Sequence, residues 1–366
     1  MNWNDVESRR LALQAELDAQ KSGIDRNKLG QYATPTALAR DMLAYGLKQL
    51  PEGKAVRFLD PAIGTGSFYA ALGHELGDRK LEWAKGFEID RHYGEPAAAL
   101  WEGGALDLTF GDFTEMKPAG SRDLANLLIA NPPYVRHHHI PAEKKASLQI
   151  ASEHSCGVRM AGLSGLYCHF LALSHQWMDE GGIAGWLIPS EFMDVNYGAA
   201  VKRYLLSKVT LLRIHRFDPV DVQFEDALVS SAVVWFRKGP PPPGHQVEFS
   251  FGGTLGSPKL VRMVAASQLN PETKWTRYPH QADAASAAGL TVGDLFAIKR
   301  GIATGDNGFF VMSAERAEEL DIPRDVLRPI LPSTRYVPDD EIFTETDGTP
   351  RVERQLFLLD CRLDES

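Results

Sequence analysis

The chain has 366 residues, a length that favours two domains over one compact core. Hydrophobic residues make up 44% and charged residues 24%, values typical of folded globular proteins, so disordered and fibrous classes are excluded. With 39 basic and 48 acidic side chains the net charge is −9, which excludes a uniformly basic nucleic-acid binder but allows a local basic face.

The three cysteines are Cys156, Cys168 and Cys361. They lack the pair spacing of a disulfide framework or a cysteine zinc site, which favours a reducing cytoplasm. No window has the roughly 20 apolar residues of a membrane span. The first twenty residues lack the apolar stretch of a signal peptide. We therefore expect a soluble cytoplasmic protein with no membrane partner.

Short β-like runs alternate with helical segments over 56–237, the pattern of a mainly parallel sheet with helices on both faces. The expected helices are 36–49, 66–76, 91–101, 163–179 and 190–206, with Thr34 and Ser190 as N-caps. The expected strands are 56–59, 81–88, 108–110, 127–130, 183–188, 209–217 and 228–236. The last two strands are separated by a segment too short for a helical crossover, which favours an antiparallel hairpin at the sheet edge. The sequence thus predicts a seven-stranded α/β domain.

A run of four prolines flanked by glycines, within 238–244, cannot continue a strand or a helix. We therefore expect a Pro-rich linker over 238–246, after an N-terminal helical arm over 1–30 and a catalytic domain over 31–237. The segment 247–366 is richer in Gly, Pro and Thr and has no clear helical period. It is expected to form a smaller, irregular mixed α/β domain.

The first candidate site is a glycine turn within 60–68, which follows an apolar strand and precedes a helix. Glycine lets the backbone approach a ligand closely, and open α/β sheets bind ligands at the carboxyl ends of their strands. A dinucleotide fingerprint needs a third glycine where this chain has Tyr69, which weakens an NAD interpretation. A purely structural turn is the alternative. The candidate cofactor residues here are Asp60, Ala62, Gly64 and Gly66.

Two further strand ends carry acidic side chains. Glu88 follows the glycine turn by about 20 residues, the spacing at which a carboxylate accepts hydrogen bonds from both ribose hydroxyls of an adenosine-containing cofactor, and Ile89 comes next. Asp112 can bond an adenine amino group while Phe113 packs on the adenine ring. The plainer alternatives are a solvated strand end for Glu88 and a turn aspartate for Asp112.

The most specific segment is 127–134, Leu-Leu-Ile-Ala-Asn-Pro-Pro-Tyr. The lone pair of adenine N6 is delocalised into the ring. If the Asn131 side-chain oxygen and the Pro132 carbonyl accept hydrogen bonds from the two N–H groups of this amine, the nitrogen is drawn toward tetrahedral geometry. Its lone pair can then attack a methyl donor. Pro133 helps to restrict the loop, and Tyr134 can stack on a base rotated out of the duplex. A simple turn is the structural alternative.

The motifs that carry a family resemblance are 60–68, Glu88, Asp112 with Phe113, and 131–134. They resemble the successive motifs of S-adenosylmethionine-dependent methyltransferases that modify adenine N6 in DNA. The upstream segment 30–35, Gly-Gln-Tyr-Ala-Thr-Pro, resembles the N-terminal cofactor motif of the gamma order, as in TaqI-like restriction-modification enzymes. The resemblance implies a Rossmann-like methyltransferase domain and adds Tyr32, Thr34 and Pro35 to the cofactor site. It also implies that Phe224 packs on the face of the flipped adenine opposite Tyr134.

In the gamma order a target recognition domain follows the catalytic domain. The segments 300–310 and 326–331 resemble the specificity domains of those enzymes. The resemblance implies double-stranded DNA as a partner, with a cognate restriction endonuclease or other defence-system subunits alongside. Because the family's C-terminal domain commonly extends further, the resemblance leaves open whether the recognition domain is complete at Ser366.

Two other features have bland interpretations. Three consecutive histidines, His137–His139, cannot converge on one ion from a strand or a helix, so no metal site is expected. The stretch 199–216 contains five cations and no acid, which fits a phosphate-facing surface and a solvated helix face equally well. These cations are Lys202, Arg203, Lys208, Arg213 and Arg216.

The function expected from the sequence is transfer of a methyl group from S-adenosylmethionine to adenine N6 at a short DNA sequence, in a restriction-modification or phage-defence system. One alternative is a methyltransferase acting on RNA or on protein glutamine, because Asn-Pro-Pro-Tyr also occurs in such enzymes. An alternative of another class is a non-catalytic DNA-binding specificity or anti-restriction subunit.

Overall fold

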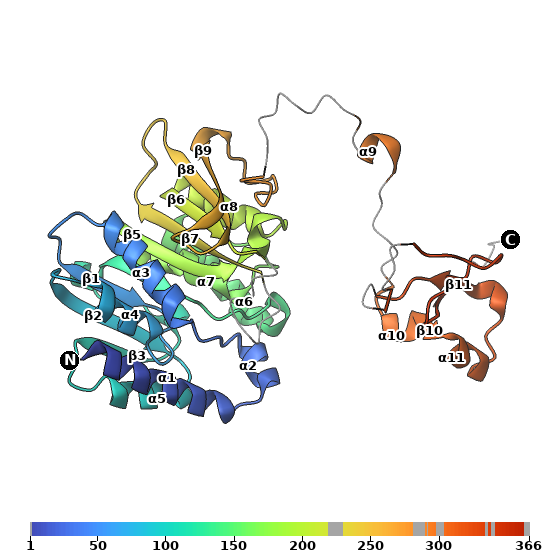
Figure 1. Ribbon diagram of the computed structural model, residues 1–366, viewed down its shortest axis with the longest axis horizontal. Coiled ribbons are helices and arrows are strands. Elements are labelled where there is room, and N and C mark those ends of the chain that lie inside the picture. The colour runs from blue at the N-terminus through green and yellow to red at the C-terminus, as the bar shows by residue number, and fades with distance from the viewer. Residues whose placement is uncertain are drawn as a thin grey trace. The chain divides into compact units, whose positions relative to one another are not determined.

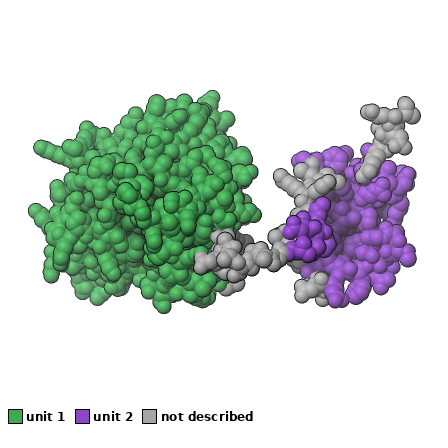
Figure 2. Space-filling model, turned by 90° about the horizontal axis from the view of Figure 1, so that it is seen from above, with its two compact units in different colours: residues 1–284 green, residues 285–366 purple. Residues whose placement is uncertain are grey.

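The computed structural model describes residues 2–218, 230–280, 290, 292–297, 304–333, 336–337 and 341–361. The chain divides into two compact units, Met1–Ala284 and Ala285–Ser366, which Figure 2 shows in different colours. In the described part of the chain, no helix combines the length and the apolar character that crossing a membrane requires.

Unit 1 is built on a nine-stranded sheet of order β3-β2-β1-β4-β5-β7-β6-β8-β9 (Figure 1). The strands are β1 (Val56–Asp60), β2 (Leu81–Glu88), β3 (Leu106–Phe110), β4 (Ala125–Ala130), β5 (Met178–Pro189), β6 (Val209–Arg216), β7 (Ser231–Lys238), β8 (Gln246–Gly253) and β9 (Pro258–Ala265). β3, β2, β1, β4 and β5 run parallel, and β7 pairs antiparallel with both β5 and β6. The α/β class and the seven predicted strands are confirmed.

The expected hairpin, β6 with β7, is antiparallel but does not form the sheet edge. β6 also pairs in parallel with β8, and β8 pairs antiparallel with β9, which becomes the edge. The proline run is only the connection between β7 and β8, so the structural division lies near residue 284 and not over 238–246. The physical reason is that Val247 and Phe249 of β8 are buried in the same core as β6 and β7. Prolines end a strand, but they do not by themselves separate two cores.

Helices cover both faces of this sheet. One face packs against α1 (Trp3–Ala19), α3 (Thr36–Gln49), α4 (Ser67–Glu75) and α5 (Arg91–Leu100). The other packs against α6 (Ala142–Cys156), α7 (Leu166–Leu173) and α8 (Gly198–Ser207). The short helix α2 (Gly23–Leu29) follows α1.

Two predicted helices are shorter than expected. The segment 163–179 forms α7 and a 3-10 turn, and then enters β5 at Met178 because this residue pairs with Ala125 of β4. The segment 190–206 begins with a 3-10 turn that contains Ser190, so Ser190 does not cap α8. Thr34 is also not an N-cap: Pro35 holds that position before α3.

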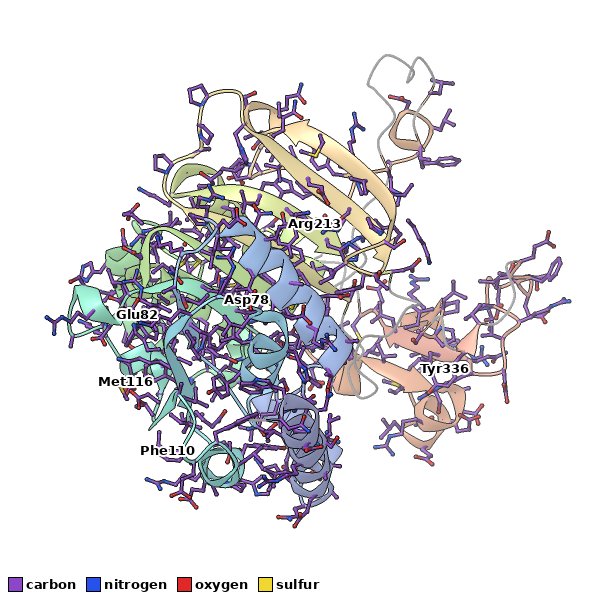
Figure 3. The ribbon with its side chains drawn as sticks, turned by 60° about the vertical axis from the view of Figure 1, so that its left-hand side comes forward. Asp78, Glu82, Phe110, Met116, Arg213 and Tyr336 are labelled. Atoms are coloured by element: carbon purple, nitrogen blue, oxygen red, sulfur yellow. The ribbon has the colours of Figure 1, made fainter. Side chains whose placement is uncertain are left out.

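The basic stretch 199–216 is partly interior. Lys202 is buried, and its ammonium donates to the carbonyls of Met193 and Thr273 at 3.2 and 2.8 Å. Arg213, labelled in Figure 3, is also buried and pairs with Glu248 of β8 at 2.7 Å. The expectations of a phosphate-facing surface and of a solvated helix face are therefore wrong for these two cations, because Lys202 donates to backbone carbonyls and Arg213 pairs with a carboxylate inside the unit.

Unit 2 contains a three-stranded antiparallel sheet of order β10-β12-β11. Its strands are β10 (Val311–Ser313), β11 (Leu327–Ile330) and β12 (Leu356–Leu359), and its short helices are α9 (Val292–Leu295), α10 (Asn307–Phe310) and α11 (Ala314–Glu319). Its buried core is small and comprises Met312, Ala317, Leu327 and Phe357. The predicted mixed α/β character is confirmed.

Candidate functional site

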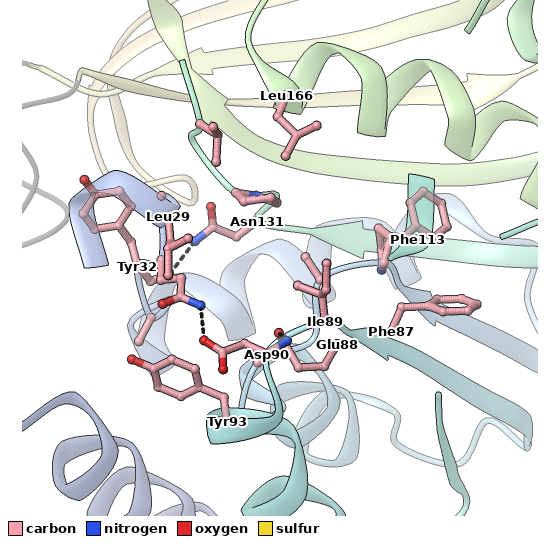
Figure 4. Close-up of a pocket in the computed structure, with 18 of the residues that line it drawn as sticks. Leu29, Tyr32, Phe87, Glu88, Ile89, Asp90, Tyr93, Phe113, Asn131 and Leu166 are labelled. Atoms are coloured by element: carbon pink, nitrogen blue, oxygen red, sulfur yellow. Dashed lines mark hydrogen bonds between the residues drawn. The ribbon is translucent and has the colours of Figure 1, made fainter. Parts of the chain in front are cut away.

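The carboxyl ends of β1, β2, β3 and β4 open onto a pocket of about 790 Å³ (Figure 4). The predicted site residues that line it are Tyr32, Ala62, Gly64, Glu88, Ile89, Asp112, Phe113, Asn131 and Pro133. Those that are not part of its lining are Thr34, Pro35, Asp60, Gly66, Pro132 and Tyr134. Phe224 lies outside the described residues. The structure therefore brings motifs from four strand ends and from the segment before α3 into one cavity.

Glu88, at the end of β2, is the best-oriented carboxylate of the pocket. Its Oε2 accepts from the Gly64 N–H at 2.9 Å, and its Oε1 accepts from the Asp90 N–H at 2.7 Å. Burial raises the pKa of Glu88, against the lowering effect of these backbone hydrogen bonds. A carboxylate has about four acceptor positions, and the Ile89 N–H acts as a third backbone donor, so about one position remains for a ligand hydroxyl. The adjacent Ile89 is 67% exposed and offers an apolar surface beside it.

The glycine turn is held in shape by Trp101 and Asp60. Gly66 has a φ of +93°, and a Cβ there would lie 2.5 Å from Nε1 of Trp101, so this glycine is required by packing. The same indole nitrogen donates to the Thr65 carbonyl at 3.0 Å. Asp60 is almost fully buried and accepts from the Ala62 N–H at 3.1 Å. Burial raises the pKa of Asp60 to about 8, so its carboxyl supports the turn largely in the neutral form near pH 7.

Asp112 is already paired with protein groups. Its Oδ1 accepts from the N–H and the hydroxyl of Thr114 at 2.8 and 2.7 Å, and its Oδ2 accepts from Lys144 at 2.9 Å. Burial alone would raise the pKa of Asp112, but these hydrogen bonds hold it below its usual value. A ligand amino group would therefore share Oδ2 with Lys144. Phe113 lies next to Asp112, and its ring packs against Phe87 at 5.4 Å between centroids.

The orientation of Asn131 is set by two acceptors. Its Nδ2 donates to the Tyr32 carbonyl at 3.0 Å and to the Thr34 hydroxyl at 3.1 Å; Figure 4 draws the first of these contacts. Because a backbone carbonyl can only accept, the amide cannot be flipped, and Oδ1 must lie on the opposite side. Among the described residues no donor contacts Oδ1. The amide therefore presents an unused acceptor at the wall of the pocket.

Tyr134 packs beside the segment 30–35. Its N–H donates to the Gly30 carbonyl at 3.2 Å, and its hydroxyl donates to the Leu187 carbonyl at 3.1 Å. Its ring is 8% exposed and lies 5.7 Å from the ring of Tyr32, centroid to centroid. Gly30 permits this contact, because a Cβ there would lie 2.2 Å from the Tyr134 nitrogen. Of the two rings, it is Tyr32 that lines the pocket.

The helical arm, α5 and its N-cap supply pocket residues that sequence reasoning missed. They are Gln14, Asp18, Lys21, Asp90 and Tyr93, and Gln31 of the predicted 30–35 motif also lines the pocket. Lys21 pairs with Asp90, and Gln31 donates to Asp90 at 2.8 Å, as Figure 4 shows for the second contact. Tyr93 donates its hydroxyl to Asp18 at 2.8 Å. The mixed charges of the arm look like those of any solvated helix, so the only available signal is the proximity of Gln31 to the Tyr-Ala-Thr-Pro segment.

Comparison with known proteins finds similarity to one protein family and to two of its type II relatives. Residues 75–223 match the Eco57I restriction-modification methylase family. The type II methyltransferase M.XamI of Xanthomonas campestris pv. amaranthicola is 28% identical over 308 residues, 80% of this chain and 55% of the relative. M.AccI of Acinetobacter calcoaceticus is 28% identical over 357 residues, 92% of this chain and 63% of the relative. This chain is similar to type II restriction-modification methyltransferases. It spans less than two thirds of the length of either relative.

Two solved structures have a similar fold. A Listeria monocytogenes protein described as a class I S-adenosylmethionine-dependent methyltransferase superposes with a TM-score of 0.54 at 20% identity, covering 70% of this chain and 77% of that chain. The type IIG restriction endonuclease BpuSI superposes with a TM-score of 0.56 at 17% identity, covering 92% of this chain and 43% of that chain. The fold is that of class I S-adenosylmethionine-dependent methyltransferases, and S-adenosylmethionine is the cofactor that this fold and these relatives imply.

The residues of the pocket fit that cofactor. Glu88 keeps an acceptor position for a ribose hydroxyl, and the exposed side chain of Ile89 and the segment at Asp112 and Phe113 suit an adenine ring. The volume of about 790 Å³ falls in the range of ligand pockets, and Asn131 is part of the lining.

Proposed function

We propose that this chain is an S-adenosylmethionine-dependent DNA methyltransferase that modifies adenine N6 at a short sequence within a restriction-modification or phage-defence system. The observation that carries the proposal is the orientation of Asn131, whose Nδ2 is held by the Tyr32 carbonyl and the Thr34 hydroxyl while Oδ1 is left to accept. An acceptor that is fixed in place before the reaction stabilises charge that develops on an attacking amine.

The chemistry follows from two acceptors. Asn131 Oδ1 and the Pro132 carbonyl accept hydrogen bonds from the two N–H groups of the exocyclic amine. Among the described residues, the Pro132 carbonyl contacts no other donor. The amine nitrogen then becomes tetrahedral, with its lone pair directed outward. A neutral amide suits this position, because a carboxylate would place an unpaired charge there. Bound S-adenosylmethionine would supply the methyl group in a direct displacement: the N–C bond forms as the S–C bond breaks, S-adenosylhomocysteine is the leaving group, and the amine proton passes to water.

The base must leave the duplex to reach this site, because N6 is paired inside the double helix. We assign Tyr134 and Phe224 to the binding of the flipped base. Stacking on Tyr134 requires its covered ring to open away from Tyr32, whereas Tyr32 already lines the pocket and can contact the base directly. The roles of Thr34 and Pro35 are then indirect, through the segment that supports Asn131.

Unit 2 is our candidate for target recognition. A recognition surface separate from the catalytic cleft is the arrangement expected of an enzyme that reads base edges in a groove and carries out chemistry elsewhere. The partners proposed are double-stranded DNA and a cognate restriction endonuclease or other defence subunits, and the reaction would take place on DNA in the cytoplasm.

Sequencing of modified bases tests the proposal. The full chain is expressed in a host that lacks its own N6-adenine methyltransferases, and the host DNA is sequenced for base modification. We expect methylated adenine at one short sequence. Unmodified DNA together with methylated RNA or methylated protein glutamine would favour the alternative acceptors, and absence of methylation in all three would favour a non-catalytic DNA-binding subunit.

A further inference from the structure

Helix α1 carries a fully buried arginine whose contacts do not belong to the pocket lining. The side chain of Arg10 is 1% exposed, and that of Glu7 is 9% exposed. Arg10 donates from Nε and from Nη2 to the two carboxylate oxygens of Glu7, both at 2.7 Å. This is a bidentate pair, in which the planar guanidinium matches both oxygens of the carboxylate.

The remaining nitrogen of Arg10 holds the glycine turn. Nη1 donates to the hydroxyl of Thr65 at 3.2 Å and to that of Ser67 at 3.0 Å, the two residues on either side of Gly66. One turn further along α1, Gln14 accepts from the Thr65 hydroxyl at 2.6 Å. The turn that follows β1 is therefore bound from behind by the N-terminal arm.

Glu7 connects this arrangement to the other half of the site. Its Oε1 also accepts from the hydroxyl of Thr36, the first residue of α3. Thr36 follows directly on the segment in which the Tyr32 carbonyl and the Thr34 hydroxyl hold Asn131. One buried ion pair thus contacts both the glycine turn and the segment that supports the catalytic amide.

Such a pair is a costly way to fill space, since two apolar side chains of similar volume commonly give equal or greater stability. Its hydrogen bonds supply geometry instead. We propose that Arg10 and Glu7 are positioning residues of the active site: Arg10 holds Thr65 and Ser67 so that the glycine turn keeps its cofactor-binding shape, and Glu7 ties that turn to the Asn131 segment. The inference rests on the proposed function, because it assumes that the turn binds S-adenosylmethionine.

The chain offers a matched control in Arg213. It is also buried, pairs with Glu248 at 2.7 Å and donates to Ser250 and to the Leu255 carbonyl, but neither it nor its partners line the pocket. Arg10→Met and Arg213→Met each leave a carboxylate without its cation, so both should lower the melting temperature. Only Arg10→Met should also weaken the binding of S-adenosylmethionine, by at least tenfold in calorimetry of the full chain.

A double variant distinguishes a positioning role of Arg10 in cofactor binding from a contribution to the stability of the fold. Glu7→Leu combined with Arg10→Met removes both charges, so the melting temperature should recover relative to Arg10→Met alone. The affinity for S-adenosylmethionine should stay weak, because Thr65 and Ser67 still lack their donor. Affinity that recovers together with stability would show a merely structural role and would overturn the inference.

If Arg10→Met does not fold, Thr65→Val with Ser67→Ala tests the same contact from the other side. These near-isosteric changes remove the acceptors and leave the ion pair intact. We expect weaker binding of S-adenosylmethionine, and wild-type affinity in this variant would overturn the inference. Failure of the wild-type chain to bind S-adenosylmethionine would overturn the proposed function and the inference together, whereas equal binding by wild type and Arg10→Met would overturn the inference alone.

Discussion

Both halves of the large sheet bury polar side chains, but they use them differently. Arg213 on β6 and Lys202 on the neighbouring helix α8 donate only to carboxylate, hydroxyl and carbonyl groups of the protein among the described residues. At the ends of β2 and β4, Glu88 and Asn131 are held by some of their hydrogen-bonding atoms and keep others unused at the wall of a cavity. A buried polar group therefore indicates function when part of its bonding capacity is left open toward a cavity. Where all of that capacity is filled, the group indicates structure.

The largest loss of stability should come from removing β8 and β9, the strands that complete the part of the sheet around Arg213. A fragment of residues 1–238 lacks β8, so Arg213 loses Glu248, Ser250 and the Leu255 carbonyl, and the hydrophobic core loses Val247 and Phe249. Breaking a buried pair costs about 3–5 kcal/mol, a large part of the stability of a domain. We expect no cooperative thermal unfolding by circular dichroism for this fragment.

The matched fragment of residues 1–284 retains β8, β9 and the fully buried Trp275. It should unfold cooperatively and bind S-adenosylmethionine. Cooperative unfolding of both fragments at the same temperature would contradict the distinction between the two halves, since β8 and β9 would then be dispensable.

Next in size is the effect of Asn131→Ala on methyl transfer. Removing one fixed acceptor that acts mainly in the transition state costs about 10²–10³ in rate, so single-turnover methylation should fall by about that factor while the affinity for S-adenosylmethionine is kept. Asn126, on the strand that Asn131 follows, is the control: among the described residues its amide bonds to the Arg57 N–H and the Ala55 carbonyl alone. Asn126→Ala should lower the melting temperature and leave the rate per folded molecule nearly unchanged. Equal rate losses in both variants would contradict the role of Asn131.

Glu88→Gln should weaken cofactor binding by about 10- to 100-fold, because hydrogen bonds to a charged acceptor are worth about 1.5–3 kcal/mol. Asp60→Asn is the comparison. Burial already favours the neutral form of Asp60, whose pKa is about 8, so an amide in its place should change the affinity little near pH 7. Calorimetry with S-adenosylmethionine measures both variants. A larger loss in Asp60→Asn than in Glu88→Gln would reverse the assignment.

The smallest effect is expected for Thr34→Val. It removes one of the two acceptors that orient the Asn131 amide, and a single hydrogen bond contributes about 1 kcal/mol. Methyl transfer should slow by about fivefold at saturating S-adenosylmethionine, with the affinity unchanged. A loss of affinity without a loss of rate would instead place Thr34 in direct contact with the cofactor, the role that the family resemblance implies.

Sequence patterns predicted what is locally encoded. Runs of apolar, β-like residues located the seven strands. The strand ends that carry Glu88, Asp112 and Asn131 were recognised because polar residues come at or just after the ends of those runs. The contact of Arg10 with Thr65 joins residues far apart in the chain and leaves no local pattern. The burial of Lys202 was equally hidden, because its acceptors include the distant Thr273.

The boundary near residue 238 failed for a related reason. The proline run is a true break in secondary structure, but whether a chain leaves its domain after such a break depends on which core the next apolar residues join. Val247 and Phe249 join the core of unit 1, a choice made by tertiary packing with β6 and invisible in the spacing of the prolines.

The most direct test of the central claim is analysis of the methylated nucleoside. The purified chain of residues 1–366 is incubated with duplex DNA of mixed sequence and S-adenosylmethionine labelled in its methyl group, and the digested nucleosides are analysed by mass spectrometry. The account predicts label on N6 of deoxyadenosine with the wild-type chain and almost none with Asn131→Ala. Label on cytosine, or equal labelling of adenine by the two proteins, would contradict it.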